Sequence, residues 1–429
     1  MHLFKSFLEG LYKPTFFNLL INKNEVLDSN NVIKEIHSHI FFHEYIHFLQ
    51  DVLTSFGLRN ICTLARKLSI INHEIIDSAD TSFSIPFKSK NSSLKNETDL
   101  FNMFWGTAEL PDEDRDFAII NLEKHPNLFN PALADRSFIN VNITYRDNLD
   151  KECFYLGAIH FMEGIAHILE RNYEVGIDAP PFPYKIVEKI IRTVFSEGDF
   201  TERNFILIME TALEAHDPAE CFYNFYHACN ADGLPFTEET IARFRREYKM
   251  KWDGKRYLYA SFYYPNVVMA KEAFKALFNH HEQLVQLNEW SKILLKNAVK
   301  IRRAGFSFTD LLVSDGRKEL VEKNLSRIIH KLGTPVMSDG RFGIFMLSPE
   351  RKIPEETMIH LLSLEAVSNI LDGDTTCSIL PFCKYGKHGI DISDGDCISA
   401  PWNRTKKKPY CPLAKIWIMW GFVKKDVSV

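Results

Sequence analysis

The sequence predicts an α+β fold that is predominantly helical, with a small sheet and a small irregular module at its C-terminal end. Amphipathic patterns with helical spacing cover residues 31–56, 155–173 and most of 185–305. Residues 138–145 alternate apolar and polar side chains, as a half-buried strand does. After Leu332, Gly, Pro and Asp become frequent, and four of the eight cysteines follow residue 376.

We expect two regions with a boundary between residues 335 and 336. Residues 1–335 form the helix-rich region, and residues 336–429 form the cysteine-containing module. Residues 79–98 are rich in Ser, Asn and Lys, so we expect a loop or an insertion there.

The composition is that of an ordinary globular protein, because 45% of the 429 residues are hydrophobic and can supply a sizeable core. The net charge of −5 gives no argument for a nucleic-acid or membrane partner. No secretory signal and no apolar stretch of membrane length is visible. We therefore expect a cytoplasmic protein whose cysteines are thiols or metal ligands.

The most informative stretch is FFHEYIHFLQD, residues 41–51, in the helix predicted over 31–56. This helix should begin after the polar cluster at 28–31 and stop near Gly57. His43 and His47 are four residues apart, so on a helix they share one face and can bind one metal ion. Glu44 is rotated by about 100° from His43 and can reach a water on that metal. Metal-assisted hydrolysis requires this arrangement.

The rest of the predicted helix indicates that it is buried, because apolar side chains cover most of its circumference. The remaining polar stripe must then find partners inside the protein. His39, Gln50 and Asp51 share the stripe with the two histidines, so we expect them to hold or orient the ligands. Histidines that are satisfied by core hydrogen bonds are the competing interpretation.

HEYIH at 43–47 resembles the active-site helix of the zincin metallopeptidases. The resemblance covers a single helix, and it implies that His43 and His47 bind zinc and that Glu44 is the general base. The extended signature of the metzincin branch is absent after His47. This leaves a gluzincin-like arrangement, in which a Glu from a later helix is the third ligand.

MEGIAH at 162–167 resembles the Glu-bearing helix of the gluzincins, which implies Glu163 as the third zinc ligand. Asp51, Glu210 and Glu365 are the alternatives. His160 and His167 lie on the same predicted helix and could stabilise an oxyanion or orient a ligand. By analogy, the strand at 138–145 is expected to be the edge along which an extended peptide pairs.

Cys377, Cys383, Cys397 and Cys411 suggest a second metal site in the C-terminal module. Their spacing lacks a Cys-x-x-Cys pair, so structural Zn²⁺, no metal and an iron–sulfur cluster all stay open, in that order of preference. His388 could replace one of the cysteines.

We therefore expect an intracellular zinc metallopeptidase, an endopeptidase in preference to an exopeptidase, that acts on a protein or peptide and is controlled by access or by a regulatory partner. The alternative is a non-catalytic interaction or regulatory protein with a structural or degenerate zinc site. A fourth zinc position closed by His39, His160 or Asp51 would indicate this alternative.

Overall fold

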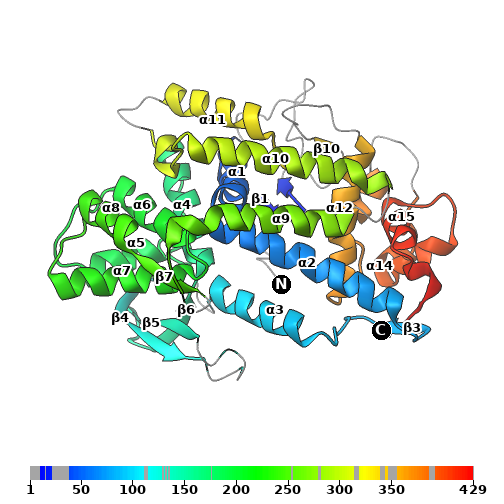
Figure 1. Ribbon diagram of the computed structural model, residues 1–429, viewed down its shortest axis with the longest axis horizontal. Coiled ribbons are helices and arrows are strands. Elements are labelled where there is room, and N and C mark those ends of the chain that lie inside the picture. The colour runs from blue at the N-terminus through cyan, green and yellow to red at the C-terminus, as the bar shows by residue number, and fades with distance from the viewer. Residues whose placement is uncertain are drawn as a thin grey trace.

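The chain is predominantly helical with small sheets, as predicted for an α+β protein (Figure 1). The computed structural model describes residues 10–14, 16–21, 38–110, 115–127, 130, 133, 136–174, 176–252, 255–278, 282–313, 318–338, 344–345, 355–385 and 392–428. Within these residues, no helix has the length and apolar character that a membrane span requires.

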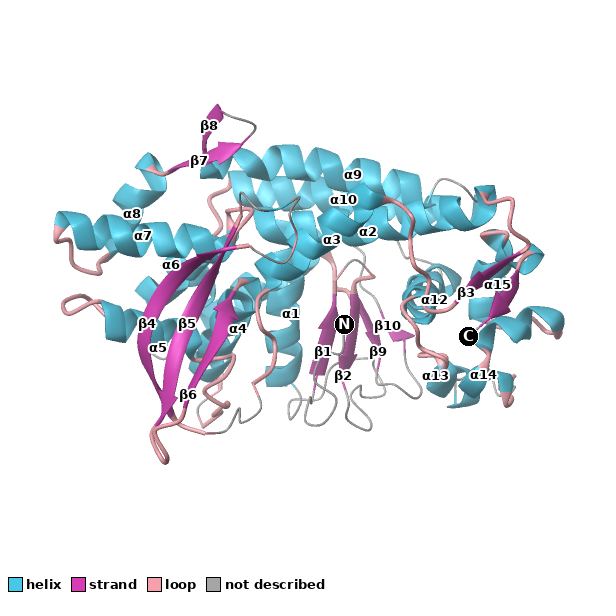
Figure 2. Ribbon diagram, turned by 90° about the horizontal axis from the view of Figure 1, so that it is seen from below, coloured by secondary structure: helices cyan, strands magenta, loops and turns pink. Residues whose placement is uncertain are grey.

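Three long helices form the centre of the molecule. Helices α2 (Ser55–Asp77), α9 (Tyr263–Phe278) and α10 (Val285–Arg303) lie side by side in both views (Figures 1 and 2). Their buried side chains recur with helical spacing, as Leu58, Ile61, Ala65 and Leu68 do on α2. This period places one apolar face of each helix in the common core.

Helix α1 (Ser38–Leu53) is buried along nearly its whole length, as its aromatic circumference predicts. It packs against α2, against α4 (Ala158–Tyr173) and against a small sheet. The N-terminal part of the predicted helix and its polar cap lie outside the described residues.

The predicted helix stop at Gly57 is wrong. The first helix already ends at Leu53, and a second helix, α2, begins at Ser55. The Thr54 hydroxyl accepts the backbone N–H of Gly57 at 3.0 Å and thereby caps the new helix. A Cβ atom on Gly57 would lie 2.3 Å from the carbonyl oxygen of Gln50. The glycine is therefore required for the first turn of α2 to pack against the end of α1.

The small sheet beside α1 contains β1 (Gly10–Lys13), β2 (Asn18–Ile21), β9 (Val336–Ser338) and β10 (Ile344–Phe345), in that order (Figure 2). β1 and β2 are antiparallel, and β2 runs parallel to β9. β1 is one of the two edge strands among the described strands of this sheet, and it contacts α1. The predicted boundary before residue 336 falls directly before β9, which belongs to this sheet.

A second sheet contains β4 (Phe117–Pro126), β5 (Ser137–Tyr145) and β6 (Lys151–Leu156), all antiparallel. The predicted alternation is confirmed, because alternate residues of β5 from Ile139 to Tyr145 are buried. The prediction that this strand offers a free edge to a peptide is wrong, because β4 and β6 pair with both of its edges. β6 takes up the start of the helix predicted from residue 155, so that α4 begins only at Ala158.

Residues 79–98 are more regular than the predicted loop, because they contain β3 (Ser82–Ser84) and the beginning of α3 (Ser92–Trp105). The Asn91 side chain accepts the backbone N–H of Leu94 at 3.0 Å and starts this helix. The polar residues of this stretch indicated a loop, but one of them, Asn91, instead caps a helix.

The C-terminal segment pairs with residues 82–84, which precede it by more than 300 positions. β11 (Asp426–Ser428) pairs in parallel with β3, and the rings of Phe83 and Trp417 stack at a centroid distance of 6.2 Å. Figure 2 shows this strand pair beside the C-terminal end of the chain. Apolar residues from both sides of residue 335 belong to one continuous core.

The remaining elements are α5 (Ile186–Val194), α6 (Glu202–Leu213), α7 (Pro218–Asp232), α8 (Glu238–Glu247), β7 (Lys249–Trp252), β8 (Lys255–Leu258), α11 (Lys318–Leu332), α12 (Glu355–Leu371), α13 (Leu380–Tyr385), α14 (Asp396–Ser399) and α15 (Pro412–Met419). Short 3₁₀ segments cover Tyr259–Phe262, Glu282–Leu284, Phe308–Leu311, Pro401–Lys406 and Phe422–Lys424.

Candidate metal centre

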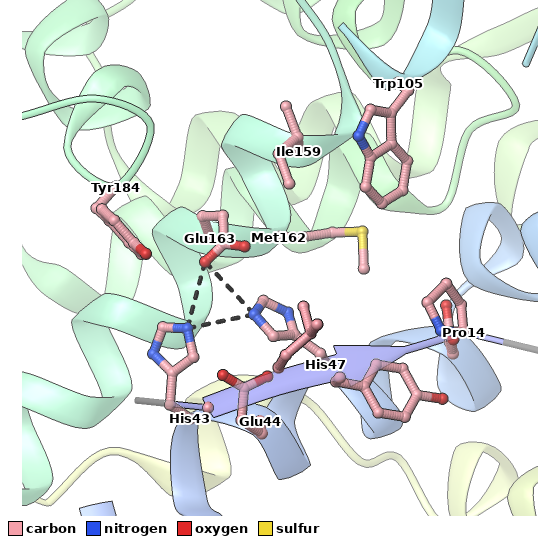
Figure 3. Close-up of a pocket in the computed structure, with 13 residues that line it drawn as sticks. Pro14, His43, Glu44, His47, Trp105, Ile159, Met162, Glu163 and Tyr184 are labelled. Carbon is pink, nitrogen blue, oxygen red and sulfur yellow. Dashed lines mark hydrogen bonds and ion pairs between the residues drawn. The ribbon is translucent and has the colours of Figure 1, made fainter. Parts of the chain in front are cut away.

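Two histidines of α1 and one glutamate of α4 meet in the interior of the protein (Figure 3). The Nε2 atoms of His43 and His47 lie 3.2 Å apart. The nearest carboxylate oxygen of Glu163 is 3.2 Å from the first of these nitrogens and 3.4 Å from the second. The helical spacing of the histidines and the packing of α1 against α4 therefore bring three ligand atoms to one point.

The opposite side of each imidazole is held by another side chain. Nδ1 of His43 lies 2.9 Å from a carboxylate oxygen of Glu170, and Nδ1 of His47 lies 2.9 Å from the amide oxygen of Gln50. The Gln50 amide donates to the carbonyl oxygen of Met162 at 2.9 Å, which fixes the orientation of that amide. Because both acceptors face Nδ1, the proton of each neutral ring belongs on Nδ1 and Nε2 is free to bind a metal.

The histidines and glutamates of the centre shift one another's pKa values. Burial alone would lower the pKa of His43, but Glu170, Glu163 and Glu44 together hold it well above its ordinary value. The pKa of His47 is raised in the same way, chiefly by Glu163. Burial would raise the pKa of Glu163, yet the two histidines hold it well below its ordinary value. The centre therefore holds a carboxylate that is ready to neutralise a cation.

Glu44 lies beside the three converging residues, and only 6% of it is exposed. Burial raises its pKa, and His43, His47 and the backbone N–H of Tyr12 in β1 oppose that increase. β1 passes so close that a Cβ atom on Gly10 would lie 2.7 Å from Cγ and 2.8 Å from Oε1 of Glu44. The edge strand thus fixes the position of this carboxylate.

A cavity of about 60 Å³ lies at this point. It is lined by residues of β1, α1 and α4, and also by Pro14, Trp105 and Tyr184. Figure 3 shows the Tyr184 hydroxyl on the same side as Glu163. The indole N–H of Trp105 is buried and has no hydrogen-bond partner among the described residues. The cavity therefore combines candidate metal ligands, a carboxylate and two side chains that can donate hydrogen bonds.

Of the residues expected to support the centre, Gln50 contacts a candidate ligand directly. Asp51 lines the same cavity, where burial raises its pKa to about 7, and it faces Tyr12 and Asn60. His39 lies one turn before His43 on α1 and near enough to Glu170 to lower its pKa.

His160 and His167 do not line the cavity. Nδ1 of His160 accepts the backbone N–H of Gly157 at 3.1 Å at the start of α4, and its ring packs between Phe154 and Phe182. His167 is fully buried, and its ring packs against Tyr184 at a centroid distance of 5.8 Å. Neither histidine is therefore placed to bind an oxyanion in the cavity.

The alternative third ligands have other partners. Glu210 accepts from the Ser307 hydroxyl at 2.6 Å and faces Arg302, and Glu365 accepts from Asn18 at 2.7 Å and pairs with Lys13. These contacts place both carboxylates in other parts of the fold. Among the described residues, only His43, His47 and Glu163 gather their ligand atoms within 4.8 Å of one another.

Two residues of the centre were not predicted from the sequence. Glu170 lies two helical turns after Glu163 on α4, so its spacing could have identified it as a side chain on the same face. Tyr184 reaches the cavity from the segment between α4 and α5, where the sequence carries no comparable signal.

Comparisons with known protein families, with curated proteins and with solved structures find no match to this chain. A functional assignment must therefore rest on the geometry and chemistry of the site itself.

Proposed function

We propose that this protein is a zinc-dependent metallopeptidase that cleaves peptide bonds in a protein substrate, with Glu44 as general base. One observation carries the proposal: His43, His47 and Glu163 direct three ligand atoms to one point at the wall of a cavity that Glu44 also lines. Two imidazoles and one carboxylate form one of the ligand sets used by catalytic zinc, which leaves a further position for water.

The surroundings of the three residues support zinc as the metal. Neutral imidazoles bind zinc through one nitrogen when the other nitrogen donates to an acceptor, and Glu170 and Gln50 supply these acceptors. The Glu163 carboxylate is charged and would offset part of the charge of the ion. When bound, zinc would act as a Lewis acid on a substrate carbonyl and would acidify a bound water.

Glu44 is placed to move the proton in this reaction. Burial raises its pKa, which makes it a stronger base than an exposed glutamate, and the N–H of Tyr12 orients it. Its carboxylate would take a proton from the attacking water and pass it to the leaving nitrogen of the peptide bond. His43, His47 and Glu163 would keep their positions throughout.

Two further side chains are suited to the substrate. The Tyr184 hydroxyl faces the cavity from the side of Glu163 and can donate to an oxygen that becomes negative during the reaction. The unpartnered N–H of Trp105 can donate to a peptide carbonyl. β1 supplies a sheet edge next to Glu44, and an extended peptide can pair with such an edge.

The small size of the cavity favours a narrow choice of substrate. At about 60 Å³ the cavity is much smaller than the roughly 300–1,000 Å³ of pockets that enclose a small-molecule ligand. A small site of this kind is consistent with narrow substrate choice and with control by a partner.

The Glu44→Gln variant tests the proposal against the non-catalytic alternative. We expect this variant to retain zinc and to lose hydrolysis by about 100-fold or more, because the general base is gone while the three ligands remain. Glu239→Gln, which changes an exposed glutamate of α8, is the matched control and should leave both properties unchanged. The assay would measure the zinc content and the cleavage of a peptide library by mass spectrometry. Equal cleavage by Glu44→Gln and the wild type would contradict the proposal.

A further inference from the structure

The four cysteines after residue 376 are brought together by four separate pieces of the C-terminal segment. Cys377 lies in the turn before α13, Cys383 lies in α13, Cys397 lies in α14 and Cys411 is the residue that caps α15. The backbone N–H of Cys377 donates to the carbonyl oxygen of Cys397 at 2.8 Å, which places these two residues side by side. Residues separated by up to 34 positions thus meet at one place.

Their thiol groups are enclosed. Cys377, Cys397 and Cys411 are each only 5% exposed, and Cys383 is half-buried. Burial, together with the other three cysteines nearby, raises the pKa of Cys383 to about 12. Cys377 shows the same effect from burial and from its neighbours Cys411 and Cys397. All four sulfur atoms are therefore electrostatic neighbours, although none forms a disulfide.

Two groups that favour negative charge lie next to these cysteines: a backbone N–H at a helix N-terminus and a buried arginine. The Sγ atom of Cys411 accepts the backbone N–H of Ala414 at 3.4 Å, at the N-terminus of the eight-residue helix α15. Arg404 is only 5% exposed, forms an ion pair with Asp394 at 2.7 Å and also faces Cys411. A buried arginine and helix N–H groups stabilise negative sulfur, so the surroundings favour thiolates once a metal displaces the protons.

We propose that Cys377, Cys383, Cys397 and Cys411 bind an iron–sulfur cluster, one thiolate to each corner of a four-iron unit. The site is separate from the His43 centre and does not depend on the proposed peptidase function. Four thiolates are the ligand set of such a cluster.

The four sulfur atoms do not form the close group that a single zinc ion requires. Tetrahedral zinc with bonds of about 2.3 Å places its thiolates only about 3.8 Å apart. Within the described residues, which include all four cysteines, no three of these sulfur atoms come within 4.8 Å of one another. The histidine centre of the same structure does meet that limit. A four-iron unit is larger than one ion and holds its thiolates further apart. His388, the predicted replacement for a cysteine, lies outside the described residues.

The direct test is anaerobic purification of the full chain from iron-supplemented cells, followed by analysis of iron, acid-labile sulfide and zinc. We expect about four iron and four sulfide per chain, together with the broad visible absorption of a cluster that bleaches on reduction. Zinc in place of iron at these cysteines would overturn the cluster assignment. The absence of any metal bound by them would overturn the site.

Variants locate the metal. Cys383→Ser and Cys397→Ser should each lose most of the iron, whereas Cys221→Ser, which changes a buried cysteine of α7, should retain it. His43→Ala should also retain the iron and lose only the zinc of the other centre. Iron that persists in both Cys383→Ser and Cys397→Ser would contradict the proposal. The iron and sulfide content of the wild type tests it even if a variant does not fold.

Discussion

The Nδ1 atom of His43 lies 2.9 Å from a carboxylate oxygen of Glu170, while Nε2 of the same ring lies 3.2 Å from Glu163. One glutamate therefore orients the ring from behind, and the other lies where a metal ligand is needed. The two glutamates are on one face of α4, so a single helix supplies both contacts.

Replacement of Glu170 should weaken metal binding without removing a ligand. We expect Glu170→Ala to lower zinc affinity by about 10- to 100-fold, because the ring of His43 loses its orienting acceptor. Glu174→Ala, which changes a half-exposed glutamate at the end of α4, is the matched control and should bind zinc as the wild type does. Competition titration with a chromophoric chelator would measure both. Equal affinities would show that Glu170 does not support the centre.

A methyl group on Gly10 should impair hydrolysis but not zinc binding. The new Cβ atom would lie 2.7 Å from Cγ of Glu44, so either β1 or the carboxylate must move. A misplaced base should reduce kcat by about tenfold or more. Gly395→Ala is the matched control, because nothing lies within 4 Å of a Cβ atom there. Full activity of Gly10→Ala with zinc bound would show that the position of β1 does not control Glu44.

Zinc affinity should increase with pH through the neutral range. The pKa values of His43 and His47 are raised in the metal-free protein, so these rings carry protons that zinc must displace. Each displaced proton makes the affinity rise up to about tenfold per pH unit until the raised pKa is passed. Calorimetry in buffers of different ionisation enthalpy would count the released protons. If zinc binding released no protons near neutral pH, the raised pKa values of the two histidines would be contradicted.

The buried His160 should make the metal-free protein sensitive to acid. Burial lowers the pKa of His160 to about 3, from 6.5 for an ordinary histidine. Between these two pH values the unfolded chain binds a proton that the folded chain does not. The free energy of unfolding therefore falls as the pH falls, by at most about 1.4 kcal/mol per pH unit from this group. At higher pH the effect vanishes, because the ring is neutral in both states.

Urea unfolding at several pH values, with a chelator present, would measure this effect. The slope below pH 6.5 should be smaller in His160→Gln, whereas His330→Gln, at an exposed position of α11, should match the wild type. Identical slopes for the His160→Gln variant and the wild type would show that His160 is not neutral in the fold.

The sequence predicted those features that depend on local spacing. The shared face of His43 and His47, the burial of α1 and the alternation of β5 all follow from helical or strand period. The resemblance of the Glu163 helix supplied the third residue. The position of β1 over Glu44, the approach of Tyr184 and the free or paired edges of strands depend on long-range packing. Those features could not be read from local pattern, and the predicted edge role of β5 was accordingly wrong.

Crystals of the zinc-loaded protein, with anomalous scattering measured on both sides of the zinc absorption edge, test the central claim most directly. We predict one zinc peak within bonding distance of Nε2 of His43, Nε2 of His47 and a carboxylate oxygen of Glu163, with the fourth position open towards Glu44. A peak elsewhere, or a fourth position closed by Asp51 or another side chain, would contradict the account.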